Sequence, residues 1–309
     1  MKQIQTVYDH IRSNNIKTLL LVISFPIIFI LLIFLFTWIV VPADQAFTTT
    51  VGVAIPTFIA CAVWLLISWA FGDSMMLNSA HAHEISNDDP KNKEIFRAVE
   101  NVAIAAGLPC PRVYIIDDNS MNAFATGRTP KDASVALTRG IIKKLDRLEL
   151  EGVIAHEMAH IGNRDIRLDM LLITGVGVTV FAADVILRTA IYGSSDRDDN
   201  KNSAAILLMV WLAFMVFNWI ITPILRMAVS RNREYAADAT GAQITRNPKA
   251  LANALRKITT DSRVECLDKV KSMAAVCIAY PGGPREFISS LMATHPPVEE
   301  RIKRLESMS

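Results

Sequence analysis

The chain has 309 residues, of which 51% are hydrophobic and 20% are charged, and 32 Lys and Arg offset 30 Asp and Glu. A soluble domain normally carries about 25% charged residues, so the composition indicates that apolar surface faces something other than water. The low content of Gly and Pro excludes a collagen-like or disordered chain, and the near-neutral charge gives no electrostatic basis for nucleic-acid binding. Four scattered cysteines without a CxxC pair argue against a disulfide framework or a cysteine-ligated metal.

Two long stretches near the N-terminus, residues 19–41 and 51–71, contain no ionisable side chain. About 20 apolar residues in a helix span the hydrocarbon core of a bilayer, so both stretches are long enough to cross. The first is too long for a cleaved signal peptide and should be retained. Basic residues precede it, whereas the connector at residues 42–50 has no Lys or Arg. The positive-inside rule therefore predicts that the N-terminus and the chain after residue 71 are cytoplasmic.

Two further hydrophobic stretches lie downstream, at residues 170–187 and 204–225. The second has no charge, and the first contains Asp184. We predict that both cross the membrane, with the charged residues 193–202 at the far surface. A buried helical hairpin within the polar part of the protein is the alternative. In both cases the chain returns to the side that it left.

The polar segment at residues 72–167 mixes helix and strand signals. Apolar residues at helical spacing predict a helix over residues 92–106 that stops at Gly107. Residues rich in β-branched and small side chains predict three short strands, at residues 112–118, 121–127 and 133–138. The second polar segment, residues 226–309, is predicted to be mostly helical with an irregular break at Tyr280.

The strongest chemical signal is an HExxH motif. Asp146 and Glu149 form a capping-box pattern that opens a helix through His156 and His160. The two histidines are four residues apart, so they share one helix face and can bind one metal ion from the same side, with Glu157 close enough to act as a general base. An exposed histidine pair is the alternative, but the apolar neighbours indicate a buried helix, where unpaired histidines are costly.

A catalytic zinc site needs a third protein ligand and an open position. Glu234 is the best candidate, because Glu234 and Asp238 are again four apart on a predicted helix. Glu234 would bind the metal, and Asp238 would accept the free N–H of a ligating histidine. By itself this pair is also compatible with a solvated helix face. The pairing of Glu234 with the histidines requires that the intervening hydrophobic stretches both cross the membrane or both stay out of it.

Several motifs in a fixed order give the chain a resemblance to the HtpX-like membrane zinc metalloproteases, relatives of the CAAX prenyl proteases. These motifs lie at residues 122–127, 148–160, 163–165, 233–238 and 294–301. The resemblance implies a gluzincin-like endopeptidase that holds one Zn²⁺ per chain through His156, His160 and Glu234, with Glu157 as base.

The resemblance also gives roles to two other motifs. Asn122, Ala123 and Phe124 would lie in an edge strand that pairs with an extended substrate, although Asn122 could equally be a turn residue. His295 would help to stabilise the oxyanion, and Arg301 would support His295 and contact the substrate. From its sequence context alone, a histidine beside two prolines is more often structural.

The prediction is thus an α+β, mostly helical integral membrane protein with four hydrophobic helices and a small β-sheet in the protease domain. Its parts are a membrane anchor, a first catalytic part, a hydrophobic hairpin and a second catalytic part, at residues 1–71, 72–167, 168–225 and 226–309. The implied function is quality control at the cytoplasmic membrane, where the enzyme faces the cytoplasm and cleaves unfolded membrane proteins; the lipid bilayer is its other partner. The alternatives are a CAAX-type prenyl protease and a zinc-stabilised scaffold without activity.

Overall fold

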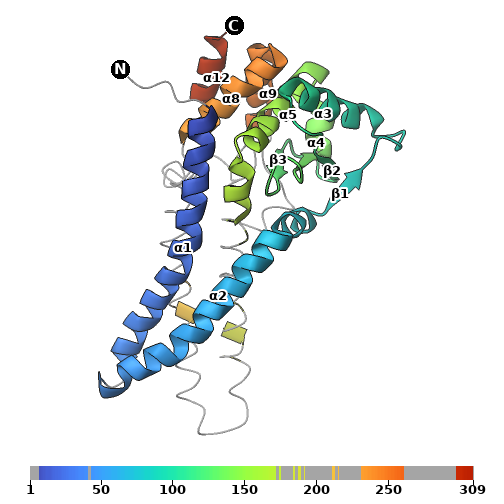
Figure 1. Ribbon diagram of the computed structural model, residues 1–309. Coiled ribbons are helices and arrows are strands. Elements are labelled where there is room, and N and C mark those ends of the chain that lie inside the picture. Colours follow the sequence, from blue (N-terminus) through green and yellow to red (C-terminus); the bar gives the residue numbers. More distant parts are fainter. Residues whose placement is uncertain are drawn as a thin grey trace.

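The structure, a computed structural model, describes residues 7–40, 43–171, 231–260 and 297–308, together with isolated positions between residues 172 and 230. Figure 1 shows a long pair of helices that leads into a smaller mixed body of helices and strands. The described part of the chain is mostly helical and contains one four-stranded sheet. The predicted third and fourth hydrophobic stretches lie for the most part outside the described residues.

The long helices are α1 (Val7–Val40) and α2 (Ala43–Ser79). They meet at the far end of the molecule and diverge toward the mixed body (Figure 1). Residues 43–50, which were predicted to connect the two spans, form the first turns of α2. Asp44 lies in the first turn, where a negatively charged carboxylate interacts favourably with the helix dipole. Among the described residues, the segment Cys61–Ser79 is long and apolar enough to cross a membrane, and α1 contains a shorter apolar stretch, Thr18–Ile28.

The sheet has the strand order β1-β2-β4-β3. The three predicted strands are present as β2 (Arg112–Ile116), β3 (Ala123–Thr126) and β4 (Ser134–Thr138). Strands β2 and β4 are parallel, and β3 and β4 form an antiparallel hairpin. The sequence analysis missed β1 (Ala82–Ile85), which pairs antiparallel with β2. Only Ile85 of this short strand is buried, so its sequence carries no clear alternation of apolar and polar residues.

Both faces of the sheet are covered. On one face, residues such as Val113, Val135 and Leu137 join the main core with the helices; on the other, Tyr114, Phe124 and Ala136 pack against the end of α2. Strands buried on both faces read as continuous apolar runs, which explains why β2, β3 and β4 are almost entirely apolar. The sheet is thus held between the body of the protein and the end of a hydrophobic helix.

Helix α3 (Lys93–Ala106) matches its predicted bounds to within one residue and ends at Gly107, which has the left-handed conformation. After β4, the short helix α4 (Arg139–Lys144) leads to α5 (Arg147–Gly162). Asp146 and Glu149 form the predicted capping box at the start of α5. Residues 165–171 then form a further helical segment.

The second polar segment supplies three described helices, α8 (Arg231–Thr245), α9 (Pro248–Thr260) and α12 (Val298–Glu306). Helix α5 contacts α3, α8, α9 and β3, and almost every residue from Glu149 to Ile161 is buried. A helix that is buried on all sides is a core element. The HExxH motif therefore lies at the centre of the mixed body of helices and strands.

Close packing of α5 against α8 depends on Gly241, because a Cβ atom there would lie 3.0 Å from the backbone nitrogen of His156. We expect Gly241→Ala to push the two helices apart and to lower the free energy of unfolding by about 1–3 kcal/mol. The measurement is the thermal unfolding midpoint of the purified protein in detergent. Gly162→Ala is the matched control, since its Cβ would meet only the flexible Leu108 side chain at 3.5 Å. Equal midpoints for the two variants would contradict the close contact.

Candidate active site

Three side chains predicted to bind a metal ion converge where α5 crosses α8. The Nε2 atoms of His156 and His160 are 3.2 Å apart. The Glu234 carboxylate lies 3.7 Å from Nε2 of His156 and 3.6 Å from Nε2 of His160. All three side chains are buried or nearly so. The helical spacing in α5 and the register of α8 thus bring three donor atoms to one point.

The other ring nitrogen of each histidine contacts an aspartate. Nδ1 of His156 lies 3.0 Å from Asp238, one turn after Glu234, and Nδ1 of His160 lies 2.7 Å from Asp165, just after α5 ends. A carboxylate at Nδ1 accepts the ring N–H and leaves the lone pair of Nε2 free to bind a metal ion. Asp238 therefore lies where the sequence analysis predicted it, whereas the contact of Asp165 was not predicted.

Each aspartate is in turn compensated by a buried arginine. Arg301 of α12 donates from Nε and Nη2 to the two oxygens of Asp238, at 2.8 and 2.7 Å. Arg233 lies 3.9 Å from Asp165 and donates to Asp169 at 3.0 and 3.1 Å. Buried charges are tolerated when they are paired and hydrogen-bonded, and removal of one partner is costly. The histidines are thus fixed by two networks of buried charges.

These surroundings shift the pKa values of the two histidines in opposite directions. Burial lowers the pKa of His156 to about 4, although its hydrogen bond to Asp238 opposes this effect. Burial also lowers the pKa of His160, but the carboxylates of Glu234 and Asp165 outweigh burial and raise it to about 9. The neutral form of His156 is therefore favoured at neutral pH. The negative charge that favours a proton on His160 favours a metal cation in the same place.

Glu157 is buried beside the three donors. Burial raises its pKa to about 7, while His160 and a hydrogen bond from the Ala125 backbone oppose this rise. A carboxyl group that titrates near neutrality is suited to accept a proton and to return it. The hydrogen bond also connects Glu157 to the outer edge of β3.

The edge position predicted for residues 122–126 is present, since β3 pairs with β4 alone. The Thr138 N–H donates to the Asn122 carbonyl. Because pairing alternates along an antiparallel strand, the backbone groups of Ala123 and Ala125 point away from β4, to the open edge. Asn122 is buried, and its side-chain oxygen accepts from the Ala123 N–H. Asn122 and Ala123 therefore lie at the edge that faces α5.

Two sequence-based expectations for substrate contacts are not supported by the positions of the residues. The Phe124 side chain is buried between the sheet and α2, and Phe124 lies opposite Ala136 in the paired register, so neither side chain nor backbone faces the open edge. Arg301 is fully buried and binds Asp238. His295, the predicted partner of Arg301, lies outside the described residues.

The sequence analysis gave no separate role to Asp165, Asp169 and Arg233. Asp165 and Asp169 are four residues apart, the same helical spacing that drew attention to Glu234 and Asp238. Arg233 directly precedes Glu234. Spacing alone does not show that these charges meet, because Arg233 and Asp169 are 64 residues apart in the chain.

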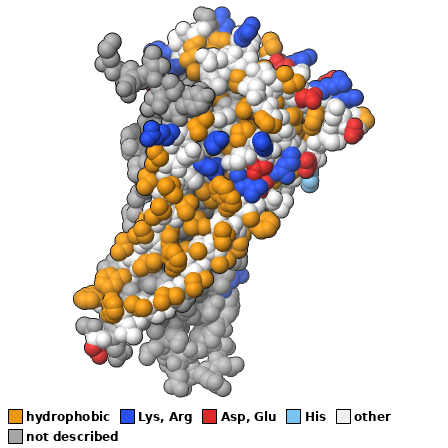
Figure 2. Space-filling view, viewed as in Figure 1, with side chains coloured by type: hydrophobic (Ala, Val, Ile, Leu, Met, Phe, Trp, Pro, Cys, Tyr) orange, Lys and Arg blue, Asp and Glu red, His pale blue; other side chains and the backbone are white. Residues whose placement is uncertain are grey.

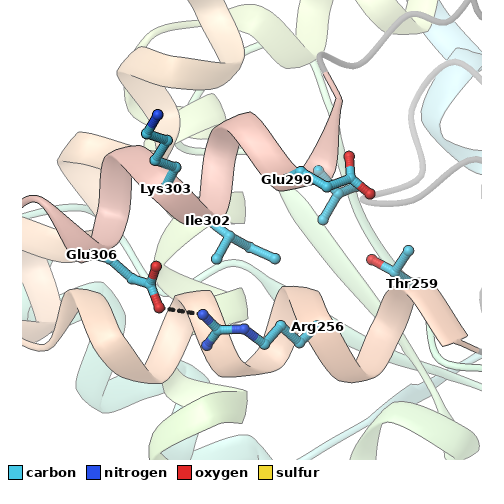
Figure 3. Close-up of a pocket in the computed structure, with 7 residues that line it drawn as sticks. Arg256, Thr259, Glu299, Ile302, Lys303 and Glu306 are labelled. Atoms are coloured by element: carbon cyan, nitrogen blue, oxygen red, sulfur yellow. Dashed lines mark hydrogen bonds and ion pairs between the residues drawn. The ribbon is translucent and has the colours of Figure 1, made fainter.

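A cavity of about 400 Å³ lies elsewhere, between α9 and α12. Figure 3 shows its lining, in which charged side chains predominate and Arg256 forms an ion pair with Glu306. None of the metal-ligand candidates lines this cavity. The candidate site at the crossing of α5 and α8 is therefore separate from this cavity.

The converging donors suit a transition metal. Two imidazole nitrogens and one carboxylate oxygen, with all donor atoms within 4.8 Å of one another, form a set that zinc takes in catalytic sites. Their free ring nitrogens are held by carboxylates, as is usual for metal-binding histidines. The residues present thus fit a single metal ion with a carboxylic acid beside it, which defines the class of HExxH metallopeptidases.

The comparisons with known proteins agree with this class. Residues 89–309 match the model of Peptidase family M48, and the chain belongs to this family. It is a metalloprotease.

The similar curated proteins include several named Protease HtpX homolog. One, from Thermoanaerobacter pseudethanolicus, is 40% identical over 308 residues and covers 99% of each chain. Another, from Bacteroides fragilis, is 38% identical and covers 95% of this chain and 96% of its own. A solved structure, the crystal structure of S. mikatae Ste24p, aligns with a TM-score of 0.47 and 18% identity, over 97% of this chain and 66% of that one.

Removal of the charge that holds His160 should weaken metal binding. We expect Asp165→Asn to reduce zinc affinity roughly 10–100-fold, because His160 loses the carboxylate that orients its ring and Arg233 loses a nearby negative charge. The measurement is zinc affinity by competition with a chelator of known strength. Asp184→Asn is the matched control, since Asp184 is half exposed and pairs with Arg188 one turn away. An unchanged affinity in Asp165→Asn would show that the contact is not needed for the site.

Proposed function

We propose that the chain is a zinc endopeptidase in which His156, His160 and Glu234 hold the metal ion and Glu157 is the catalytic base. The observation that carries this proposal is the convergence of the three donors at the crossing of two helices, each histidine being backed by an aspartate. A zinc ion at this point would act as a Lewis acid toward the peptide carbonyl and would increase the acidity of the attacking water. A site closed by a fourth protein ligand would be structural, and the proposed set has only three.

Glu157 performs the proton transfers in this proposal. Its carboxylate accepts a proton from the water that attacks the peptide carbonyl and later gives it to the nitrogen of the leaving amine. Its position next to the ligands on α5 places it within reach of the water without making it a ligand. Its burial excludes bulk solvent, which strengthens electrostatic interactions at the reacting carbonyl.

An extended polypeptide would bind along the open edge of β3. The outward carbonyl groups of Ala123 and Ala125 would accept hydrogen bonds from the substrate main chain. The Ala123 N–H, which donates to the Asn122 side chain, would donate to the substrate instead. Main-chain hydrogen bonds depend little on the side chains of the substrate, which suits a protease that cleaves varied unfolded segments. His295 would stabilise the oxyanion, and Arg301 would act at a distance by holding Asp238.

The substrates would be unfolded or misassembled membrane proteins, and the setting would be the cytoplasmic membrane with the active site facing the cytoplasm. The proposed anchor comprises α1 and α2 together with the two hydrophobic stretches between residues 168 and 225. In support of this arrangement, the start of α1, the active-site helices and α12 lie at the same end of the molecule (Figure 1).

The catalytic assignment is tested by two variants with different expected failures. We expect Glu157→Gln to retain stoichiometric zinc and to lose hydrolysis of casein by at least ~10²–10⁴-fold, because the base is absent while the ligands remain. We expect Glu234→Ala to lose zinc on dialysis. Zinc content and cleavage rate are measured on the same preparations. Near-normal turnover by zinc-loaded Glu157→Gln, or full zinc retention by Glu234→Ala, would refute the respective role.

The topology is tested with reporter fusions. A reporter that works only in the cytoplasm should be active after Asn87 and after Ser309, and one that works only outside should be active within residues 42–50. The reason is the basic N-terminus together with the need for α5 and α8 to share one compartment. If Asn87 and Ser309 report opposite sides, the common site of His156 and Glu234 in the membrane-inserted protein is excluded.

A further inference from the structure

Among the described residues, one half-buried arginine near α1 and α2 lacks the acidic partner that the buried Arg233 and Arg301 have. Arg167 lies in the helical segment after α5, and its guanidinium is 5.8 Å from the centre of the Trp69 ring of α2. Its Nη2 donates to the Asn15 side chain of α1. Arg167 therefore connects three segments that are far apart in the sequence.

The charge of Arg167 is not neutralised by the residues that the structure describes. No carboxylate among them forms an ion pair with it, and its buried Nε has no hydrogen-bond acceptor there. Burial lowers the pKa of the Arg167 guanidinium, and the exposed neighbour Arg164 lowers it further. By contrast, Arg112, near the end of α2, pairs with Asp73 at 2.8 Å. Two neighbouring arginines that form no ion pair with any described residue favour an anionic ligand.

The position of this cluster indicates what the anion is. Asn15 lies four residues before the uncharged stretch of α1, and Trp69 lies two residues before the end of the uncharged stretch of α2. Tryptophan is enriched at this level of a membrane, where its ring is apolar and its N–H is polar. Figure 2 shows hydrophobic side chains over α1 and α2 and a group of Lys and Arg side chains where this apolar surface meets the rest of the protein. The phosphates of phospholipids lie at the same level.

We propose that Arg167, with Arg164, Asn15 and Trp69, forms a binding site for the phosphate of an anionic phospholipid. Arg167 would donate from a terminal guanidinium nitrogen to a phosphate oxygen while its guanidinium stays near the Trp69 ring. Arg164 would add a second positive charge from the exposed side. The acyl chains would extend along the apolar surface of α1 and α2. The site does not involve the metal ligands, so the proposal is independent of the catalytic assignment.

The test is binding of dioctanoyl-phosphatidylglycerol to the full chain in dodecyl maltoside, measured by native mass spectrometry. We expect Arg167→Gln to weaken the apparent affinity roughly 10-fold or more, the usual effect of losing hydrogen bonds between charged groups. Arg147→Gln is the control, because Arg147 is exposed at the start of α5 and pairs with Glu151. Equal affinities of wild type and Arg167→Gln would overturn the proposal.

A second variant keeps the test decisive if Arg167→Gln fails to fold. Asn15→Asp would supply the missing carboxylate, so it should raise the unfolding midpoint of the lipid-free protein and weaken phosphatidylglycerol binding to a similar extent. Wild-type lipid affinity in Asn15→Asp would contradict the site. Sodium phosphate is tested as a competitor. Displacement of the lipid by an equal concentration of phosphate would assign the site to a free anion and overturn the lipid assignment.

Discussion

The structure depends on the compensation of a cluster of charges that is buried where α5 crosses α8. Two histidines and Glu234 meet there, and without partners they would be costly to remove from water. Asp238 with Arg301 balances one histidine, and Asp165 with Arg233 and Asp169 balances the other. These partners come from three separate segments, α8, α12 and the residues after α5. The need to neutralise this cluster thus determines how α8, α12 and the residues after α5 pack around the HExxH helix.

The sheet contributes an open strand edge beside Glu157, where the substrate would bind next to the proposed base. In the described part of the chain β3 is the last strand of the sheet, so the backbone groups of Ala123 and Ala125 do not pair with a further strand there. Glu157 on α5 takes the Ala125 N–H as its partner, so the strand edge and the base are in direct contact. The apolar packing of β3 on both faces fixes this edge in position.

Local features of the fold and site were predictable, and features formed by distant contacts were not. The α5 capping box, the histidine pair and the Glu234–Asp238 pair follow from helical spacing within a few residues. The start of α2 at Ala43 also had a local signal, Asp44 after Pro42, which the strong apolar run that follows obscured. Arg301 and Arg233 could not be placed, because a charge run in a sequence does not show which distant carboxylate it meets. Strand β1 is short and half exposed, so its pattern is weak.

The helical segment at residues 165–171 contacts both the candidate active site and the helices α1 and α2, because its side chains alternate between two sides of the helix. Asp165 and Asp169 are four residues apart and share the side that faces Arg233 of α8. Arg167 lies two residues from each, about 200° around the helix, and its guanidinium reaches α1 and α2 instead. The segment at residues 165–171 therefore holds His160 with one side and contacts α1 and α2 with the other. Because α5 leads into this segment through a turn at Asn163, a rotation of the segment would move Asp165 relative to His160. The orientation of His160 thus depends on the same segment whose Arg167 contacts α1 and α2.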